Sequence, residues 1–156
     1  MMPRSPLLGA ILLLAACREA DVVAPPQDPQ QVNYAPELQV DLSKMIRTES
    51  GLYYADIRVG DGELAERGDT VRLLYAGYLP NGTLLEARLT PTEAAAVVLG
   101  AESIIDGWNE GIPGMRAGGV RKLVVPPELG FGKLGKRPVP PNAVLVFDLE
   151  ILADGS

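Results

Sequence analysis

Histidine is absent from this chain of 156 residues, and cysteine occurs only once. Without histidine there can be no Ser-His-Asp triad, no Cys-His pair and no imidazole-bound metal. A single thiol can form neither an internal disulfide nor a cysteine-rich zinc site. Aromatic side chains are also scarce, at 5% of residues, with two phenylalanines, one tryptophan and five tyrosines. Any activity must therefore rest on chemistry that needs neither imidazole nor thiolate.

Positive charge is in the minority, with 14 Lys and Arg against 20 Asp and Glu and a net charge of -6. This sign repels phosphates and argues against a nucleic-acid partner. The acidic residues between Asp61 and Asp69 lack the ligand spacing of a calcium loop, so we expect no metal. The pattern GxGxxG at residues 130–135 is flanked by prolines instead of a strand and a helix, which predicts a loop and no nucleotide cofactor.

The first sixteen residues are predicted to be an export signal. Arg4 is their only charged side chain, and the apolar run at residues 7–16 is too short to span a bilayer. Cys17 follows Leu-Ala-Ala directly, and this resembles the signal of bacterial lipoproteins, which implies an acylated Cys17 at the start of the mature chain. Arg18 after it is compatible with an outer-membrane location facing the periplasm. The alternative is an ordinary cleaved signal with an unmodified Cys17.

Residues 17–45 are expected to form a tether between this anchor and the domain. Residues 24–31 are rich in proline and glutamine and show no apolar periodicity, which is typical of an extended, unpacked segment. Leu38, Leu42 and Met45 are spaced like a short helix, which could also contact a partner chain. The sequence leaves the oligomeric state open, and we place the domain at residues 46–156.

The domain itself is predicted to be α+β, with strands outnumbering helices. Strands are expected at residues 70–78, 95–99, 120–125 and 144–152, because β-branched and aromatic residues are concentrated there. In the last of these, alternation places Phe147 and its apolar neighbours on one face and carboxylates on the other. A short helix is expected at residues 106–112, between Gly100 and Pro113.

The order of motifs over the last hundred residues resembles the FKBP-type peptidyl-prolyl cis-trans isomerases. The segments that carry the resemblance are Tyr-Ala-Gly-Tyr-Leu at 75–79, Ile-Ile-Asp-Gly-Trp at 104–108, Pro-Pro-Glu-Leu-Gly-Phe-Gly at 126–132, Pro-Pro-Asn-Ala at 140–143 and Leu-Val-Phe-Asp-Leu-Glu at 145–150. The family fold, a twisted antiparallel sheet wrapped around one short helix, agrees with the elements expected above.

The resemblance also implies a site, an apolar pocket that binds proline-containing polypeptides. In it Trp108 would form the floor, and the Ile105 N–H would hold a substrate carbonyl. Tyr75 and Glu86 would orient the peptide. The remaining walls and the loop over the pocket would come from Leu85, Ile104, Phe131, Val139 and Phe147.

Four positions depart from the usual family pattern. The phenylalanine and aspartate that follow the Asn-Gly turn are Leu85 and Glu86 here, a further pocket aromatic is Ala95, and the loop tyrosine is Phe131. Two functions therefore follow from the resemblance: an isomerase acting on Xaa-Pro bonds of exported proteins, or a chaperone or peptide-binding module with the same fold and little turnover. A purely structural envelope lipoprotein is a third reading.

Overall fold

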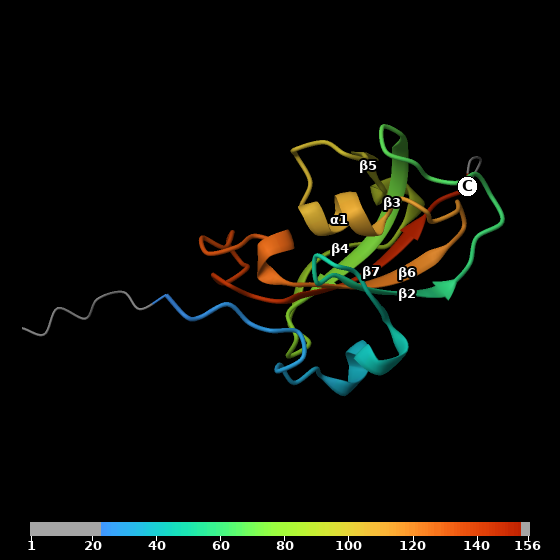
Figure 1. The fold of residues 1–156 in the computed structure, drawn as a ribbon. Coiled ribbons are helices and arrows are strands. Elements are labelled where there is room, and N and C mark those ends of the chain that lie inside the picture. The colour runs from blue at the N-terminus through green and yellow to red at the C-terminus, as the bar shows by residue number, and fades with distance from the viewer. Residues whose placement is uncertain (1–22, 154–156) are drawn as a thin grey trace, which may run out of the picture.

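The computed structural model describes residues 23–153, so the predicted export signal and Cys17 lie outside the described residues. These residues form one seven-stranded sheet with a single α-helix, α1 (Asp106–Gly111) (Figure 1). The strands are β1 (Ile46–Arg47), β2 (Tyr53–Arg58), β3 (Thr70–Tyr78), β4 (Leu84–Arg88), β5 (Ala95–Val98), β6 (Val120–Val125) and β7 (Leu145–Ile151). Short 3-10 helices lie at Pro36–Leu38, Leu42–Lys44, Pro91–Glu93 and Pro127–Leu129.

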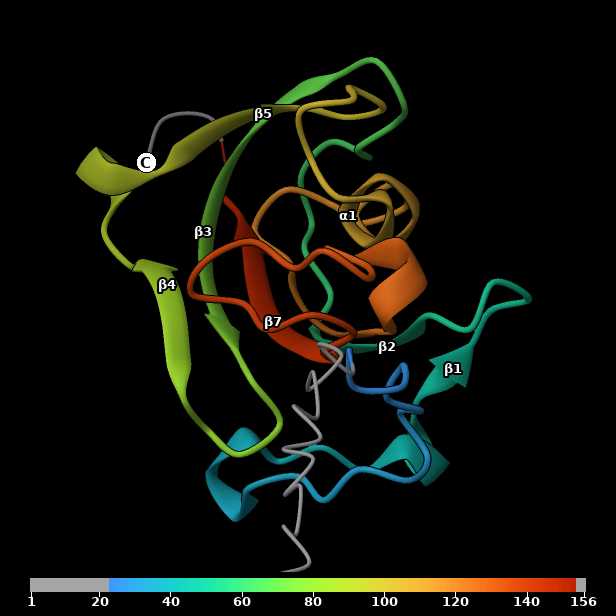
Figure 2. The same cartoon turned by 90° about the vertical axis from the view of Figure 1, so that its left-hand side faces the viewer.

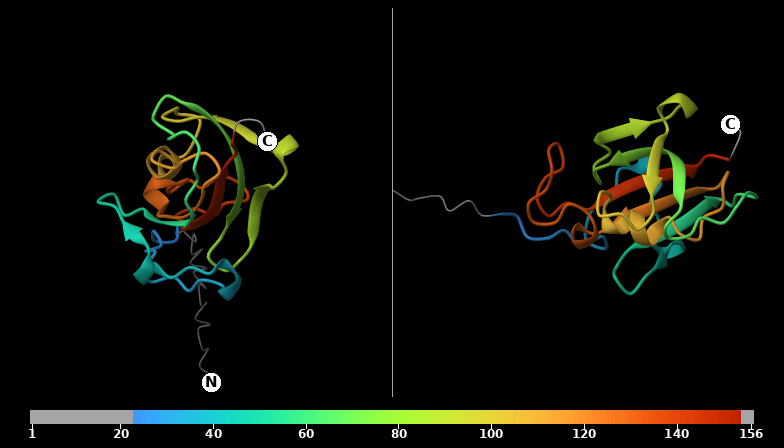
Figure 3. Two further views of the ribbon diagram at one scale, coloured as in Figure 1. Left: turned by 90° about the vertical axis from the view of Figure 1, so that its right-hand side faces the viewer. Right: turned by 90° about the horizontal axis from the view of Figure 1, so that it is seen from above.

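All neighbouring strands are antiparallel, in the order β1-β2-β6-β7-β3-β4, and β5 pairs with the first half of β3. Strand β3 therefore pairs with two strands in succession. Its pairing with β5 ends at the Leu73–Ala95 pair, and its pairing with β4 begins at the Tyr75–Arg88 pair. The sheet curls around α1, as the end-on views show (Figures 2 and 3). This is the predicted α+β architecture, and β3 and β6 have the predicted bounds.

Helix α1 lies close against the sheet because two of its residues have no side chain. A Cβ on Gly107 would lie 2.6 Å from Val125 Cγ1, and one on Gly111 would lie 2.8 Å from Leu123 Cδ1. Residues four apart lie on the same face of a helix, so both glycines lie on the face of α1 that contacts β6. The C-terminal end of α1 is held by Arg121, whose Nη1 donates to the Gly111 carbonyl at 2.9 Å. These contacts fix the height of Trp108 above the sheet.

The opposite face of the sheet is covered by residues 23–45, which differs from the expectation of a free tether. Leu38 is only 4% exposed and packs with Tyr53, Val124, Val144 and Val146. In Figure 1 this segment, in blue, lies on the side of the sheet away from α1. Composition alone suggested an unpacked chain, but a few scattered apolar side chains suffice to cover an apolar strip of strands. Val146 is therefore buried although it faces away from the main core.

Backbone bonds join the start of this segment to the loop before β7. Asn142, 4% exposed, accepts a hydrogen bond from the Gln27 N–H at 3.0 Å, and its Nδ2 donates to the Ala24 carbonyl. Gln27 Oε1 accepts from the Val144 N–H at 2.9 Å. Residues 24–27 and the loop ending at Asn142 therefore lie side by side at one end of the molecule (Figure 3, right).

Two further features of the fold differ from the sequence-based expectations. The spacing of Leu38, Leu42 and Met45 predicted one short helix, whereas the structure has two separate 3-10 turns there. Strand β4 was not predicted, because its sequence Leu-Leu-Glu-Ala-Arg alternates poorly. Within residues 23–153, no helix is both long enough and apolar enough to cross a bilayer.

Candidate functional site

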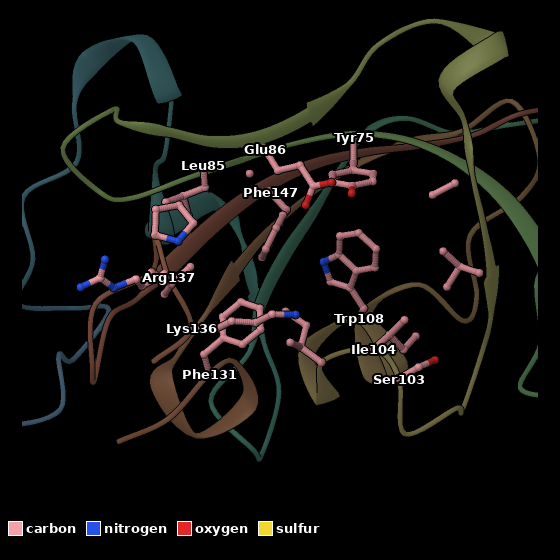
Figure 4. A pocket seen from close by; sticks show the side chains of 16 residues that line it. Tyr75, Leu85, Glu86, Ser103, Ile104, Trp108, Phe131, Lys136, Arg137 and Phe147 are labelled. Carbon is pink, nitrogen blue, oxygen red and sulfur yellow. The ribbon is translucent and has the colours of Figure 1, made fainter. Parts of the chain in front are cut away.

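A cavity of about 320 Å³ opens between the curled sheet and α1 (Figure 4). Its walls come from β3, β4, β5, β7, the start of α1 and the loop at residues 131–139. The side chains and backbone that line it are Tyr75, Gly77, Leu85, Glu86, Ala95, Val97, Ser103, Ile104, Ile105, Trp108, Phe131, Lys136, Arg137, Pro138, Val139 and Phe147. Most are apolar, so the cavity suits an apolar ligand group.

Three aromatic rings form the inner part of this pocket. The Trp108 ring lies 4.9 Å from the Tyr75 ring and 5.3 Å from the Phe147 ring, at interplanar angles of 76° and 80°. Edge-to-face packing of this kind is the favoured geometry for aromatic pairs. Phe147 can lie flat against β3 because Gly77 is opposite it, and a Cβ there would be 2.6 Å from Phe147 Cε1. The three rings thus hold each other in place.

The indole nitrogen of Trp108 is a free hydrogen-bond donor. Trp108 is 8% exposed, and its Nε1 has no hydrogen-bond partner among the described residues. In Figure 4 the nitrogen edge of the indole faces the part of the pocket where Phe131 and Phe147 lie. A buried donor without a partner is unfavourable, and a ligand oxygen or a water in the pocket would relieve it.

A polar group lies beside the rings at the edge of the sheet. Glu86 and Arg88 lie on β4 next to Tyr75, and Arg88 Nη2 lies 3.5 Å from Glu86 Oε1. Burial, followed by the neighbouring Glu86 carboxylate, raises the pKa of the Tyr75 hydroxyl above its usual value. Tyrosine is protonated at neutral pH in any case, and the Glu86 carboxylate beside the hydroxyl favours that form.

The loop that leads into α1 is held by Asn109. Its Oδ1 accepts from the Gly100 N–H at 2.6 Å and its Nδ2 donates to the Ala101 carbonyl at 2.9 Å. This positions Ile104 and Ile105 on the pocket wall. Within residues 23–153 the Ile105 N–H has no acceptor, whereas its carbonyl accepts from the Trp108 N–H. A free backbone donor thus lies at the rim of the apolar pocket.

All nine pocket residues expected from the sequence line this one cavity, although their individual roles stay predictions. They are Tyr75, Leu85, Glu86, Ile104, Ile105, Trp108, Phe131, Val139 and Phe147. Four of the chain's eight aromatic residues therefore meet here.

Sequence reasoning missed several further lining residues. Val97 could have been found, because it lies two residues after Ala95 in a predicted strand and shares its face. Lys136, Arg137 and Pro138 lie in an irregular loop, where no periodicity signals orientation. Among the described residues, no group of three or more histidine, cysteine, aspartate or glutamate side chains is placed to hold a metal ion.

Comparison with known proteins assigns this architecture to a family. The model of the FKBP-type peptidyl-prolyl cis-trans isomerase domain matches residues 61–152. An FK506-binding protein of Neisseria meningitidis serogroup B is 40% identical over 103 residues, which cover 65% of this chain and 94% of the relative. FkpA of Escherichia coli K12, described as an FKBP-type peptidyl-prolyl cis-trans isomerase, is 41% identical over 110 residues. This match covers 70% of the present chain but only 40% of FkpA.

Solved structures agree with the sequence relatives. The crystal structure of FkpA from Escherichia coli has a TM-score of 0.66 at 37% identity, covering 75% of this chain and 54% of that one. The crystal structure of AtFKBP13 has a TM-score of 0.65 at 32% identity, covering 70% of this chain and 97% of that one. With its curled sheet, single short helix and aromatic pocket, the chain belongs to the FKBP-type peptidyl-prolyl cis-trans isomerase family.

Proposed function

We propose that this isomerase acts on Xaa-Pro bonds of exported proteins and assists their folding in the bacterial cell envelope. The single observation that carries the site assignment is the aromatic cavity, in which Tyr75, Trp108 and Phe147 pack edge to face. The family supplies the reaction, and the location in the envelope rests on the lipoprotein-like signal that ends at Cys17.

The reaction is a rotation and breaks no covalent bond. The barrier about an amide is about 18–20 kcal/mol, and an uncatalysed Xaa-Pro bond takes tens to hundreds of seconds to isomerise. The planar amide is polar because of resonance, and twisting removes that resonance. A dry apolar cavity solvates the planar form less well than water does, so it favours the twisted form relative to the planar one. Each 1.36 kcal/mol of difference accelerates rotation about tenfold.

Specific residues then have distinct tasks in this proposal. Trp108 and Phe147 surround the proline ring and exclude water, and the Ile105 N–H donates to a peptide carbonyl. The Tyr75 hydroxyl, which is protonated at neutral pH, donates a further hydrogen bond, and Glu86 orients the chain beside it. No step needs an acid–base pair, which agrees with a chain that has no histidine.

The experiment is an isomerase assay on short Xaa-Pro peptides. We expect the wild-type protein to accelerate isomerisation and Phe147→Ala to reduce kcat/KM at least tenfold, because the side chain that excludes water from the proline is lost. Leu134→Ala is the matched control, because Leu134 is 91% exposed. Peptide binding without any acceleration by the folded wild-type protein would contradict isomerase function and select a chaperone or peptide-binding module instead.

The membrane attachment has its own test. Cells expressing the full chain are labelled with a radioactive fatty acid, and the label is expected on the wild-type protein and not on Cys17→Ser. We expect the wild-type chain in the outer-membrane fraction and the variant in the soluble periplasmic fraction. Equal labelling of both chains would contradict anchoring at Cys17.

A further inference from the structure

We propose that Lys136 makes the pocket select proline segments in which an acidic side chain adjoins the proline, an inference that rests on the proposed function of the cavity. The observation behind it is a concentration of positive charge on one loop. Lys133, Lys136 and Arg137 lie within five residues, in a chain whose net charge is -6. Two of the three, Lys136 and Arg137, line the cavity.

Lys136 is the cation placed over the pocket. Its Nζ lies 5.8 Å from the centroid of the Phe131 ring, which is itself part of the pocket wall. In Figure 4 the Lys136 side chain lies across Phe131 toward Trp108, whereas Arg137 points away from the aromatic side chains. The backbone beneath it is fixed, because the N–H groups of Lys136 and Val139 each donate to the carbonyl of the other residue, at 3.1 and 2.6 Å.

The charge of Lys136 is uncompensated among the described residues. The ion pairs there involve other cations, and none contains Lys136 or Arg137. The single carboxylate that lines the cavity, Glu86, is paired with Arg88. The mouth of the pocket therefore carries net positive charge on the side of the loop, and a peptide acid entering from that side meets a cation without a competing partner.

The size of the preference follows from the exposure of Lys136, which would form a solvent-exposed ion pair with an acidic side chain of the peptide. Exposed ion pairs contribute little free energy, and this corresponds to a preference of about two- to fivefold for the acidic peptide. Such a preference fades with salt, since charges are screened beyond about 3 Å at 1 M ionic strength. The apolar cavity would supply most of the affinity for proline, and Lys136 would discriminate among the flanking residues.

The test compares kcat/KM of the purified protein for Xaa-Pro peptides that differ in one charge. One series places Glu, Gln or Lys directly before the proline, and a second places them directly after it. In at least one series we expect the order Glu, Gln, Lys at low salt, with a Glu-to-Lys ratio that shrinks at high salt. Lys136→Gln is expected to lower this ratio two- to fivefold, and Lys136→Glu to reverse it. Lys133→Gln, on the same loop but outside the cavity lining, is the matched control.

The outcomes separate this inference from the function on which it rests. A ratio that Lys136→Gln leaves unchanged, or that Lys133→Gln changes equally, overturns the role of Lys136 while isomerase activity stands. If no peptide is turned over, the proposed function fails, and dissociation constants of the same peptides, measured by Trp108 fluorescence, decide the role of Lys136 by the same ratios. Circular dichroism of each variant shows that the fold is kept.

Discussion

Ala95 leaves one wall of the pocket with a single methyl group. It lies at the start of β5, half-buried, and lines the cavity beside Val97. The resemblance to the family pattern implied an aromatic ring at this position, where this chain has alanine. The side chain that lines the cavity here is therefore smaller than those around Trp108, and a bound ligand has less apolar surface to contact on this side.

Refilling this wall should strengthen binding. Ala95→Phe is expected to lower the KM for Xaa-Pro peptides about fivefold, because partial burial of an aromatic ring contributes about 1 kcal/mol. Ala96→Phe is the matched control, since Ala96 is the neighbouring exposed residue and does not line the cavity. An equal KM for both variants, with the fold intact, would show that Ala95 does not face the bound peptide.

At the scale of elements, the segment before β1 acts as part of the domain. Leu38 is 4% exposed within the cluster on the outer face of the sheet. Leu38→Ala is therefore expected to lower the free energy of unfolding by about 2–5 kcal/mol, the usual range for a buried leucine. Leu134→Ala, at a 91% exposed site, should change it by less than about 0.5 kcal/mol. Equal urea midpoints for the two variants would contradict the packing of this segment.

The same segment contains a tyrosine that should make stability depend on alkaline pH. The Tyr34 hydroxyl donates to the Pro29 carbonyl at 2.8 Å, and burial, followed by repulsion from Tyr53 and Asp28, raises its pKa well above the usual value. In the unfolded chain tyrosine ionises near pH 10. Because the folded pKa is the higher one, the stabilisation is fully present below about pH 10 and is lost as the pH rises further.

Tyr34→Phe removes this group and tests that sign. Between about pH 9 and pH 11 the free energy of unfolding of the wild type should fall more steeply than that of Tyr34→Phe. At pH 7 the variant should be less stable by about 1 kcal/mol, because the hydrogen bond to Pro29 is lost. Urea unfolding across this range provides the measurement. Parallel pH profiles would show that Tyr34 does not titrate differently in the folded chain.

The elements that could be predicted from the sequence are those with regular patterns. Runs of β-branched and aromatic residues located β3 and β6 to the residue, and alternation located β7 to within one residue at each end. The packing of residues 23–45 could not be predicted, because its proline content is typical of a tether and the spacing of its few apolar residues suggested one helix instead of two 3-10 turns against the sheet. The segment is ordered because it packs on the outer face of β6 and β7, and this surface exists only in the folded sheet.

The residues of the pocket likewise fall into two groups, those that could be predicted from the sequence and those that could not. Its aromatic walls could be predicted because each belongs to a strand, a helix or a motif that fixes its direction, as for Tyr75, Trp108 and Phe147. Lys136 could not, because its position depends on the turn that the Lys136–Val139 bonds close. The positive charge at the mouth of the pocket thus depends on the conformation of the folded loop, which the local sequence pattern does not predict.

At the scale of the whole molecule, the two faces of one sheet have separate tasks. The inner face, with α1, builds the aromatic pocket, and the outer face is closed by residues 23–45. Asn142 joins the two, because its N–H donates to the Gly132 carbonyl in the pocket loop while its own carbonyl and Nδ2 bond the Gln27 and Ala24 backbone. The segment nearest the predicted anchor is therefore bonded to the loop that borders the site.

The central claim is that proline peptides bind in the cavity against Trp108, which is the chain's only tryptophan. Titration of the protein with an Xaa-Pro peptide, followed by tryptophan fluorescence, tests this directly. The account predicts a saturable change with the wild type, a dissociation constant at least tenfold higher with Phe147→Ala, and no change with a matched peptide in which alanine replaces proline. Accelerated isomerisation of the peptide with no change in Trp108 fluorescence would contradict the account, because catalysis would then occur elsewhere on the molecule.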